Sequence, residues 1–249
     1  MNDRVVLIIQ ARMGSTRLPG KSMMDLAGAP LVVRILERVR RVNRIDQIVL
    51  ATSDQKQDDV LEKLAGDYKV NCFRGSENDL VDRYYQCAKL FKANVVLRLP
   101  ADNPCPEPSE YDRLIDYHVK SDNDFSSNIC NFMKNGYPDG IGVEAFSFSS
   151  LEKIWKHESS SEKREHIALN YYDYINDKIP NGSSNTVGTI QCPEEYSRTD
   201  IVLDVNTIED YHFMKQLYED LYPKNPNFTF TEIIAWYDEN IEKESLNGK

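Results

Sequence analysis

Residues 8–22 read IIQARMGSTRLPGKS, and this stretch decides the fold that we predict for the chain. It joins the end of an apolar run, Val5–Gln10, to a loop in which Arg12, Arg17 and Lys21 stand among two glycines and one proline. A short apolar run predicts a strand that is covered on both faces. Glycine lets the backbone approach a ligand closely, and concentrated positive charge favours an anion. The stretch therefore predicts a buried strand that leads into a phosphate-binding loop.

The loop looks like a Walker A motif because Gly20, Lys21 and Ser22 follow Gly14 after a strand. Five residues separate the two glycines, however, where the motif has four. The spacing matters because successive backbone N–H groups must converge on one phosphate. No convincing Walker B carboxylate and no G-x-G-x-x-G fingerprint accompany it. We therefore expect an open phosphate-binding loop rather than an ordinary P-loop. The alternative is a basic loop that is merely solvated.

Strand-like and helix-like segments alternate through the first 120 residues. Strands are expected at 5–10, 45–52, 70–73 and 95–99, and helices at 30–42, 53–67, 77–92 and 109–120. This is the spacing of βαβ units, which predicts a mostly parallel sheet with helices on both faces. The second half is less regular. Its expected strands are 125–129, 143–148, 186–190 and 201–205, and its expected helices are 149–157, 161–176, 207–222 and 229–242. We predict an α/β fold, a three-layer α/β/α sandwich with a mostly parallel central sheet and a small inserted lobe.

Composition narrows the function classes. The formal net charge of −10 argues against binding to nucleic acid or to anionic membranes, since both need a basic surface. No apolar stretch approaches the ~20 residues that span a bilayer, and the N-terminus reads as a first strand rather than a signal peptide. The five cysteines are scattered without a C-x-x-C pair, which argues against structural zinc and a disulfide framework. A cytoplasmic location is expected.

Two aspartates stand where predicted strands end. Asp102 follows the strand at 95–99 within PADNP, and Asp204 lies in the strand expected at 201–205. Open α/β sheets bind ligands at the carboxyl ends of their strands, and Mg²⁺ is commonly held by one or two carboxylates plus phosphate oxygens. Both are therefore candidate magnesium ligands. The alternatives are a turn for Asp102, and a helix cap for Asp204 or Asn206.

Taken together, these motifs resemble the cytidylyltransferases that make CMP-activated sugars. The loop from Gln10 to Lys21 is similar to the A-R-x-x-S-x-R-L-P-G-K loop of 3-deoxy-manno-octulosonate cytidylyltransferases and, more loosely, of acylneuraminate cytidylyltransferases. The spore-coat polysaccharide cytidylyltransferase-like group is the nearest match. Its pattern also appears at 74–85 (RGSENDLVDRYY), 100–104 (PADNP), 137–146 (YPDGIGVEAF) and 164–166 (REH). The resemblance covers nearly the whole chain and is specific for the superfamily, but not for the acceptor sugar.

The resemblance implies a nucleotide-diphospho-sugar transferase-like fold, one domain over residues 1–249, and often a homodimer. Residues 1–120 would be the nucleotide-binding half, and residues 121–249 the half that binds the acceptor and forms the dimer. The implied reaction moves CMP from Mg²⁺-bound CTP to a sugar, with release of pyrophosphate. The expected acceptor is an acidic 2-keto-3-deoxy sugar for a surface polysaccharide.

Site residues follow from the motifs and the resemblance together. The catalytic residues would be Arg12, Lys21 and Asp102. The nucleotide would also contact Ala11, Gly14, Ser15, Arg17 and, near the cytosine, Arg74. Metal ligands would be Asp102, Asp204 and Asn206; related enzymes carry an aspartate at the place of Asn206. Acceptor-binding candidates are Arg83, Arg98, Tyr137, Asp139, Glu144, Arg164 and His166.

Three other functions stay open at this point: a nucleotidyltransferase that uses another nucleotide, a metal-dependent glycosyltransferase that consumes a nucleotide sugar, and a non-catalytic binding protein. The basic loop favours a pyrophosphate-releasing enzyme, because a triphosphate needs several cations. Asn206 favours the binding protein, because it leaves the metal site with one charge fewer. No general base is evident in the sequence, so metal activation and positioning would carry most of the rate.

Overall fold

The computed structural model describes residues 3–130 and 132–247. Its strands are β1 (Val5–Gln10), β2 (Asp25–Leu26), β3 (Ala29–Pro30), β4 (Gln47–Ser53), β5 (Asn71–Gly75), β6 (Val95–Pro100), β7 (Phe125–Ser127), β8 (Glu144–Ser147) and β9 (Val187–Gly188). Its α-helices are α1 (Leu31–Val39), α2 (Asp59–Asp67), α3 (Leu80–Leu90), α4 (Pro108–Ser121), α5 (Phe148–His157), α6 (Ser161–Glu165), α7 (Ile208–Leu221) and α8 (Phe230–Asn247). Short 3₁₀ turns are η1 (Lys21–Met23), η2 (Lys56–Asp58), η3 (Ile167–Asn170) and η4 (Glu194–Tyr196).

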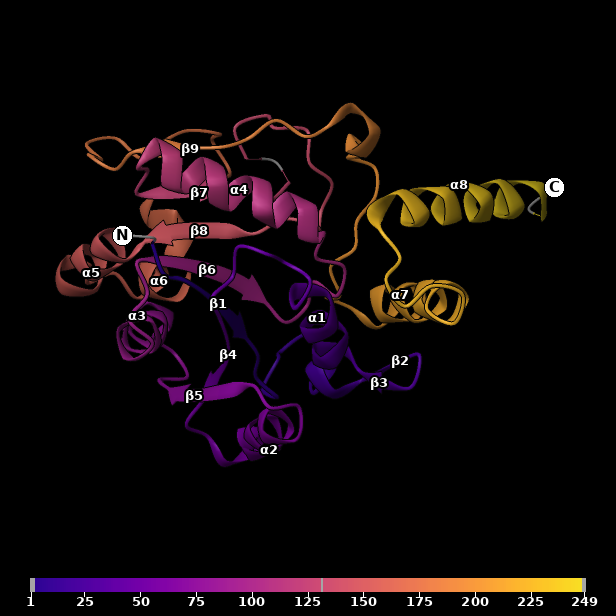
Figure 1. The fold of residues 1–249 in the computed structure, drawn as a ribbon, viewed down its shortest axis with the longest axis horizontal. Helices are drawn as coiled ribbons and strands as arrows, with labels where there is room; N and C mark the ends of the chain where they lie inside the picture. The colour runs from indigo at the N-terminus through magenta and orange to yellow at the C-terminus, as the bar shows by residue number, and fades with distance from the viewer. Residues whose placement is uncertain (1–2, 131, 248–249) are drawn as a thin grey trace.

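In the part of the chain that the structure describes, seven strands form one sheet in the order β5-β4-β1-β6-β8-β7-β9 (Figure 1). The pairs β5–β4, β4–β1, β1–β6 and β7–β9 are parallel, whereas β8 is antiparallel to both β6 and β7. Strands from both halves of the chain therefore share the sheet. The predicted mostly parallel central sheet is confirmed.

Strand β1 shows why the sheet is covered on both faces. Val5, Leu7 and Ile9 belong to one hydrophobic core, and Val6 and Ile8 belong to the other. Successive side chains of a strand point to opposite faces, so an unbroken apolar run requires a helical layer on each side. Helices α1, α2 and α4 contribute to the first core, and α3 and α5 to the second. The three predicted layers are confirmed.

The carboxyl ends of β1, β4 and β6 position the site. Backbone hydrogen bonds fix these ends to one another, from Ala11 N to Ala51 O (3.1 Å) and from Ala101 N to Gln10 O (2.8 Å). The loops that follow the three strands therefore leave the sheet side by side. Helices α7 and α8 lie beside the sheet, and α8 extends away from the body of the molecule (Figure 1). Within the described residues, no helix is long and apolar enough to cross a membrane.

Two predicted elements were wrong. Residues 201–205 are not a strand: within them only Val202 forms a bridge, with Asp139. Their apolar alternation is real, because Ile201, Leu203 and Val205 are fully buried, but it reflects packing of an extended segment into the core. The helix expected at 161–176 ends at Glu165 and is followed by η3 and turns.

The short β2–β3 hairpin was not predicted. It turns at Ala27 and Gly28, which both have positive φ.

Candidate functional site

A cleft of about 160 Å³ opens between the loop after β1 and the end of β6. Its lining includes six of the residues that the sequence predicts for nucleotide binding: Ala11, Arg12, Ser15, Arg17, Lys21 and Asp102. Pockets for whole drug-sized ligands are typically ~300–1,000 Å³. The cleft therefore has room for phosphate groups rather than for an entire nucleotide.

Asp58 holds the loop in place, although it was not among the predicted residues. Its side chain is fully buried, and Oδ1 accepts a hydrogen bond from Met13 N at 2.7 Å. Oδ2 accepts from the backbone N–H of Ser53 at 3.2 Å and from the Ser53 hydroxyl. Burial opposes ionisation, but these hydrogen bonds lower the pKa of the Asp58 carboxyl. A buried carboxylate with three donors ties the loop to β4 and so fixes its path.

Arg12 and Arg17 are two of the three cations that line the cleft. Neither forms a hydrogen bond or salt bridge with any residue that the structure describes, whereas Arg74, Arg98 and Arg164 do. Arg12 is half-buried, and Arg17 is exposed. Two free guanidinium groups beside a Gly- and Ser-containing loop form a binding site for an anion with several negative oxygens.

Lys21 is paired with the predicted metal ligand. Its Nζ lies 2.8 Å from Asp102 Oδ2 and donates to Val205 O, also at 2.8 Å. Val205 N in turn donates to Asp102 O at 2.8 Å. The segment 201–206 is therefore fastened to the end of β6, and Lys21 fills the space beside Asp102. An incoming phosphate could take over this ammonium group and release the carboxylate.

Four aspartates lie close together at this point: Asp102, Asp139, Asp204 and Asp210. Burial and then the charges of Asp139, Asp102 and Asp210 raise the pKa of Asp204 to about 6. Burial likewise raises the pKa of Asp139, which also feels the charge of Asp102. Asn206 donates its amide N–H to Asp204 Oδ2, and Asp210 caps the backbone N–H groups of Asn206 and Thr207 at 2.9 and 2.7 Å. Asp139, which we expected to bind the acceptor, thus lies close to the predicted metal ligands Asp102 and Asp204.

The chemistry of this donor set fits magnesium. Crowded, partly buried carboxylates with raised pKa values are stabilised by a divalent cation. No group of three or more His, Cys, Asp or Glu side chains within the described parts of the chain has the geometry to hold a metal ion alone. Mg²⁺ usually takes only one or two carboxylates and completes its shell with water and phosphate oxygens. Asp102 and Asp204 could supply that pair of carboxylates. The hydrogen bond from the Asn206 amide to Asp204 would first have to break.

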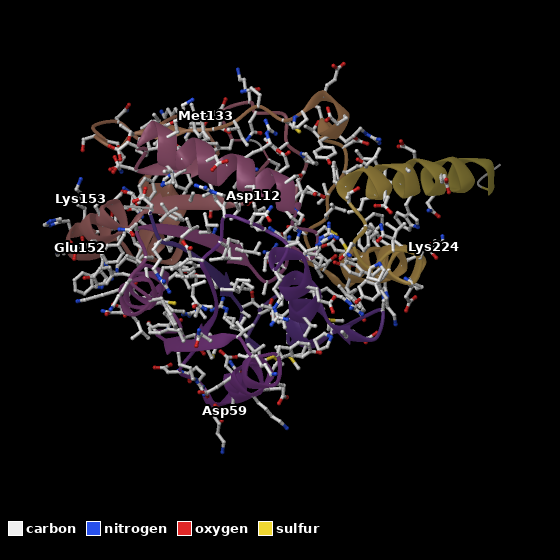
Figure 2. The ribbon with its side chains drawn as sticks, viewed as in Figure 1. Asp59, Asp112, Met133, Glu152, Lys153 and Lys224 are labelled. Atoms are coloured by element: carbon white, nitrogen blue, oxygen red, sulfur yellow. The ribbon has the colours of Figure 1, made fainter. Side chains whose placement is uncertain are left out.

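Gly14 and Arg74 lie outside the lining of the cleft. A Cβ on Gly14 would meet Gln57 Nε2 at 2.8 Å, so the loop packs closely against η2. Arg74 Nη1 pairs with Asp59 (2.5 Å) and Glu62 (2.9 Å), and its Nε donates to Ser53 O (3.0 Å). Asp59 points outward from α2 at the edge of the molecule (Figure 2). Arg74 is thus held at the carboxyl end of β5, and a role near the cytosine stays a prediction.

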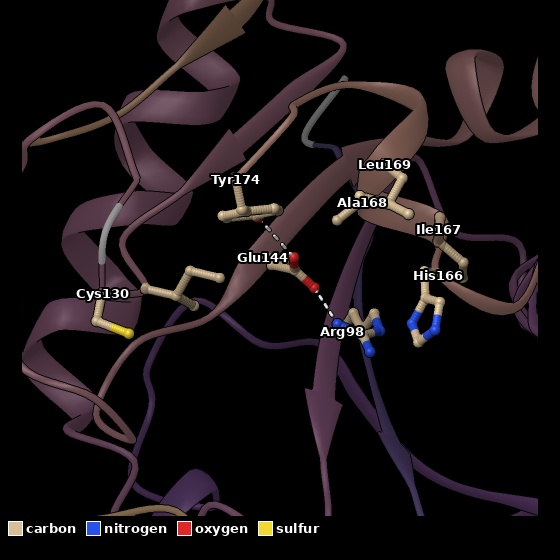
Figure 3. A pocket seen from close by; sticks show the side chains of 9 residues that line it. Arg98, Cys130, Glu144, His166, Ile167, Ala168, Leu169 and Tyr174 are labelled. Carbon is tan, nitrogen blue, oxygen red and sulfur yellow. Dashed lines mark hydrogen bonds and ion pairs between the residues drawn. The ribbon is translucent and has the colours of Figure 1, made fainter. Parts of the chain in front are cut away.

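A second and larger cavity, of about 420 Å³, brings together three predicted acceptor residues: Arg98, Glu144 and His166 (Figure 3). Arg98 and Glu144 face each other across the antiparallel β6–β8 pair and form a salt bridge. Tyr174 donates its hydroxyl to Glu144 Oε1 at 3.1 Å. The rest of the lining is mostly aliphatic, and comprises Ile129, Ile167, Ala168 and Leu169 with Cys130.

The other predicted acceptor residues are engaged elsewhere. Arg83 is fully buried and donates to the carbonyls of Ser76 and Glu77, in the loop that precedes α3. Arg164 pairs with Asp79 at 2.7 Å. Tyr137 is buried and donates its hydroxyl to Glu110, which holds the loop that carries Asp139.

Sequence reasoning missed Asp58, Val205 and Tyr174. The Asp58 contact links residues 45 positions apart, and Val205 acts through its backbone, so neither leaves a local motif. Tyr174 lay inside a segment that was expected to be helical.

A family model described as cytidylyltransferase matches residues 6–233. The spore coat polysaccharide biosynthesis protein SpsF of Bacillus subtilis (strain 168) is 32% identical over 245 residues, covering 96% of this chain and 96% of SpsF. A solved structure of a cytidylyltransferase from Leptospira borgpetersenii is similar with a TM-score of 0.84 and 28% identity, covering 97% of this chain and 96% of that one.

A third comparison concerns the fold alone. The structure of CMP:2-keto-3-deoxy-manno-octonic acid synthetase complexed with CTP has a TM-score of 0.62 and 16% identity, covering 86% of this chain and 98% of that one.

Proposed function

Since the chain belongs to the cytidylyltransferase family, we propose that it transfers CMP from Mg²⁺-bound CTP to a hydroxyl group of a sugar. The observation that carries the proposal is the cleft between β1 and β6, which Arg12 and Arg17 line together with Asp102 without an ion-pair partner among the described residues. In the proposed reaction the acceptor oxygen forms a bond to the α-phosphorus of CTP. The bond from that phosphorus to the bridging oxygen breaks, pyrophosphate leaves, and the acceptor hydroxyl releases its proton to water.

The residues of the loop would act on the leaving group. Arg12 and Arg17 would bind the β- and γ-phosphates and stabilise the charge that develops on pyrophosphate, as preorganised cations do. Lys21 would move from Asp102 to a phosphate oxygen, because an ammonium group on a flexible four-carbon stem can change its partner. Asp58 would keep the loop in this geometry through Met13 N.

Asp102 and Asp204 are the proposed magnesium ligands, with Asn206 as a third candidate. Bound magnesium would neutralise phosphate charge and lower the pKa of a hydroxyl in its shell. The carboxylates of this chain would orient the phosphates for in-line attack, which supports the rate without a separate general base.

The acceptor that the resemblance implies is an acidic 2-keto-3-deoxy sugar for a polysaccharide. The similarity to SpsF over 245 residues supports a role in polysaccharide synthesis. The acceptor would occupy the cavity between Arg98, Glu144 and His166. A homodimer formed through residues 121–249 and a cytoplasmic location complete the proposal, and light scattering tests the dimer.

A pyrophosphate-release assay tests the reaction. CTP, UTP, ATP and GTP are each supplied with Mg²⁺ and a panel of acidic and neutral sugars. We expect release with CTP in the presence of an acceptor, and none after Asp102→Asn. Binding of a nucleotide sugar without pyrophosphate release from any mixture would instead indicate a glycosyltransferase or a binding protein.

A further inference from the structure

We infer that Lys21 keeps the proposed magnesium site closed until a nucleoside triphosphate binds, so that the nucleotide and the metal bind cooperatively. The inference rests on the proposed function, because it takes Asp102 and Asp204 as the metal ligands. It follows from three features of the described residues: the position of the Lys21 ammonium group, the donors that cover both carboxylates, and the hydrogen bond that Lys21 makes to Val205.

The backbone of the loop after β1 directs Lys21 toward the end of β6. Gly20 has a positive φ of 76°, a conformation that glycine adopts without strain, and η1 begins at Lys21 directly after it. A hydrogen bond from Gly20 N to Met13 O, at 2.9 Å, closes the loop before this turn. The side chain of Lys21 is only 12% exposed. The backbone of the lysine is therefore fixed in the wall of the cleft, and its flexible side chain can still change partner.

The ammonium group of Lys21 stands where a cation would bind Asp102. Its Nζ lies 2.8 Å from Asp102 Oδ2. A magnesium ion held by the same carboxylate would lie ~2 Å from one of its oxygens. Two cations this close to one carboxylate group repel each other. Lys21 therefore opposes metal binding at Asp102, both by its charge and by the oxygen that it occupies.

The second proposed ligand is covered as well. Asn206 donates its side-chain amide to Asp204 Oδ2. Each of the two carboxylates thus already accepts a hydrogen bond from a side chain of this protein. A metal ion that arrives before the nucleotide has to displace both donors, one of which is charged.

A triphosphate can withdraw Lys21. An ammonium group has three N–H donors, and Lys21 uses two of them, for Asp102 and for Val205 O. The third has no partner among the described residues, and Lys21 lines the cleft together with Arg12 and Arg17. Phosphate groups held by the two arginines would bring several negative charges next to Nζ, whereas Asp102 offers one. The ammonium group would then transfer to a phosphate oxygen and leave the carboxylate open.

The hydrogen bond to Val205 sets a threshold for this transfer. Val205 is buried, and its carbonyl loses the Lys21 donor when Nζ moves away. A buried acceptor without a partner costs about 1–3 kcal/mol. Residues 201–206 would therefore shift when Lys21 leaves, and Asp204 would move with them. CMP, which lacks the β- and γ-phosphates, should not meet this cost and should leave Lys21 on Asp102.

Calorimetry with Mg²⁺ alone, in the absence of nucleotide, tests the inference. Lys21→Gln removes the charge and keeps a donor for Val205 O, so it should bind Mg²⁺ about tenfold more tightly than the wild-type protein. Arg17→Gln is the matched control, because Arg17 lines the same cleft but forms no ion pair among the described residues. It should keep the wild-type affinity for Mg²⁺. Both variants should bind CTP more weakly in EDTA. Equal Mg²⁺ affinities of Lys21→Gln and the wild-type protein would overturn the inference.

Crystals of the wild-type protein give a second measurement that needs no variant. After soaking with CTP in EDTA, Lys21 Nζ should contact a phosphate oxygen, and after soaking with CMP it should remain on Asp102. If Nζ stays on Asp102 with CTP, or if CTP does not bind at millimolar concentration, the inference is wrong.

The proposed function fails by a different result. Absence of pyrophosphate release from every mixture of nucleotide and acceptor refutes cytidylyl transfer. The Mg²⁺ affinity of Lys21→Gln and the position of Nζ beside CTP still decide whether Lys21 closes the carboxylate site.

Discussion

At the scale of single residues, the site depends on whether each charged side chain already has a partner. Arg12 and Arg17 have none among the described residues, whereas Arg74 is shared by Asp59 and Glu62. The sequence shows six or more arginines in plausible motifs but not which of them are neutralised. Arg98 shows the reason: its partner Glu144 lies 46 positions away and is reached only through strand pairing.

Asp58→Asn should loosen the phosphate loop. The amide NH₂ group of the variant would face the N–H donor of Met13 or of Ser53, where the carboxylate oxygen of Asp58 now accepts a hydrogen bond. A buried donor that is left without an acceptor costs about 1–3 kcal/mol of stability. We expect a lower free energy of unfolding in urea and weaker binding of Mg²⁺-CTP by calorimetry. Asp54→Asn changes an exposed carboxylate four positions away and is the control. Equal CTP affinities for the two variants would show that Asp58 does not position the loop.

Asn206→Asp tests the proposed metal site. It replaces the amide that donates a hydrogen bond to Asp204 by a second carboxylate, and the two carboxylates repel each other in the absence of metal. We expect a lower melting temperature in EDTA and a larger stabilisation by Mg²⁺ than in the wild-type protein, since a ligand that binds the folded state raises its stability.

Asn176→Asp is a matched control for this experiment. Asn176 also donates to a carboxylate, that of Asp173, but the pair is exposed and belongs to a separate turn. If magnesium stabilises both variants equally, Asn206 lies outside the metal shell.

At the scale of elements, sequence patterns predicted those strands and helices whose formation depends on the burial of neighbouring residues. Strand β1 was predicted with both of its ends, because an unbroken apolar run has few alternatives. Residues 201–205 show where apolar alternation fails to predict a strand. They alternate like a strand, yet Val205 bonds to Asp102 O and Ile201 to Arg198 O, so no neighbouring strand pairs with them. Hydrogen-bond partners of this kind are set by tertiary structure and leave no periodic signal.

The loop that carries Asp139 gives a prediction at this scale. A Cβ on Gly142 would lie 2.2 Å from Asn128 O, a backbone atom that cannot yield without moving β7. Gly142→Ala should therefore destabilise the fold by about 1–3 kcal/mol and displace Asp139 from the carboxylate cluster. Gly66→Ala is the matched control in α2, where nothing lies within 4 Å of the added Cβ. There we expect a gain of about 0.5–1 kcal/mol, because alanine favours a helix.

Urea unfolding of both glycine variants checks the two expectations. Equal stability changes of the same sign would mean that the contact between Gly142 and Asn128 does not limit the loop.

At the scale of the whole molecule, distant segments are locked together by buried polar groups. Arg38 on α1 donates to Pro106 O at 2.8 Å and to Phe228 O at 3.0 Å, and Phe230 N donates to Glu107 Oε2 at 2.9 Å. These bonds tie the start of α8 to the loop after β6. The layers and sheet were predictable from the spacing of the first 120 residues. The placement of α8 was not, because it depends on contacts between residues 123 or more positions apart.

Buried His118 should set part of the acid sensitivity of the fold. Its Nδ1 lies 2.9 Å from Ser126 Oγ, which also accepts a hydrogen bond from Asn123 and can therefore donate its own proton to a neutral imidazole. Burial lowers the pKa of His118 to about 4, although the charges of Asp124, Asp122 and Asp3 oppose the shift.

Between an unfolded pKa of about 6.5 and the folded value, the unfolded chain binds a proton that the native protein excludes. The contribution of neutral His118 to the free energy of unfolding is therefore complete above pH ~6.5 and is lost as the pH falls toward 4. The full difference is at most about 3.5 kcal/mol, since each pKa unit corresponds to ~1.4 kcal/mol. His118→Gln should flatten the fall in unfolding free energy between pH 6.5 and 4, measured by urea titration, whatever its effect at neutral pH. His157→Gln, at an exposed position on α5, should keep the wild-type slope. An unchanged slope in His118→Gln would mean that the imidazole becomes protonated in the native state near pH 6.5, and that burial against Ser126 does not exclude the proton.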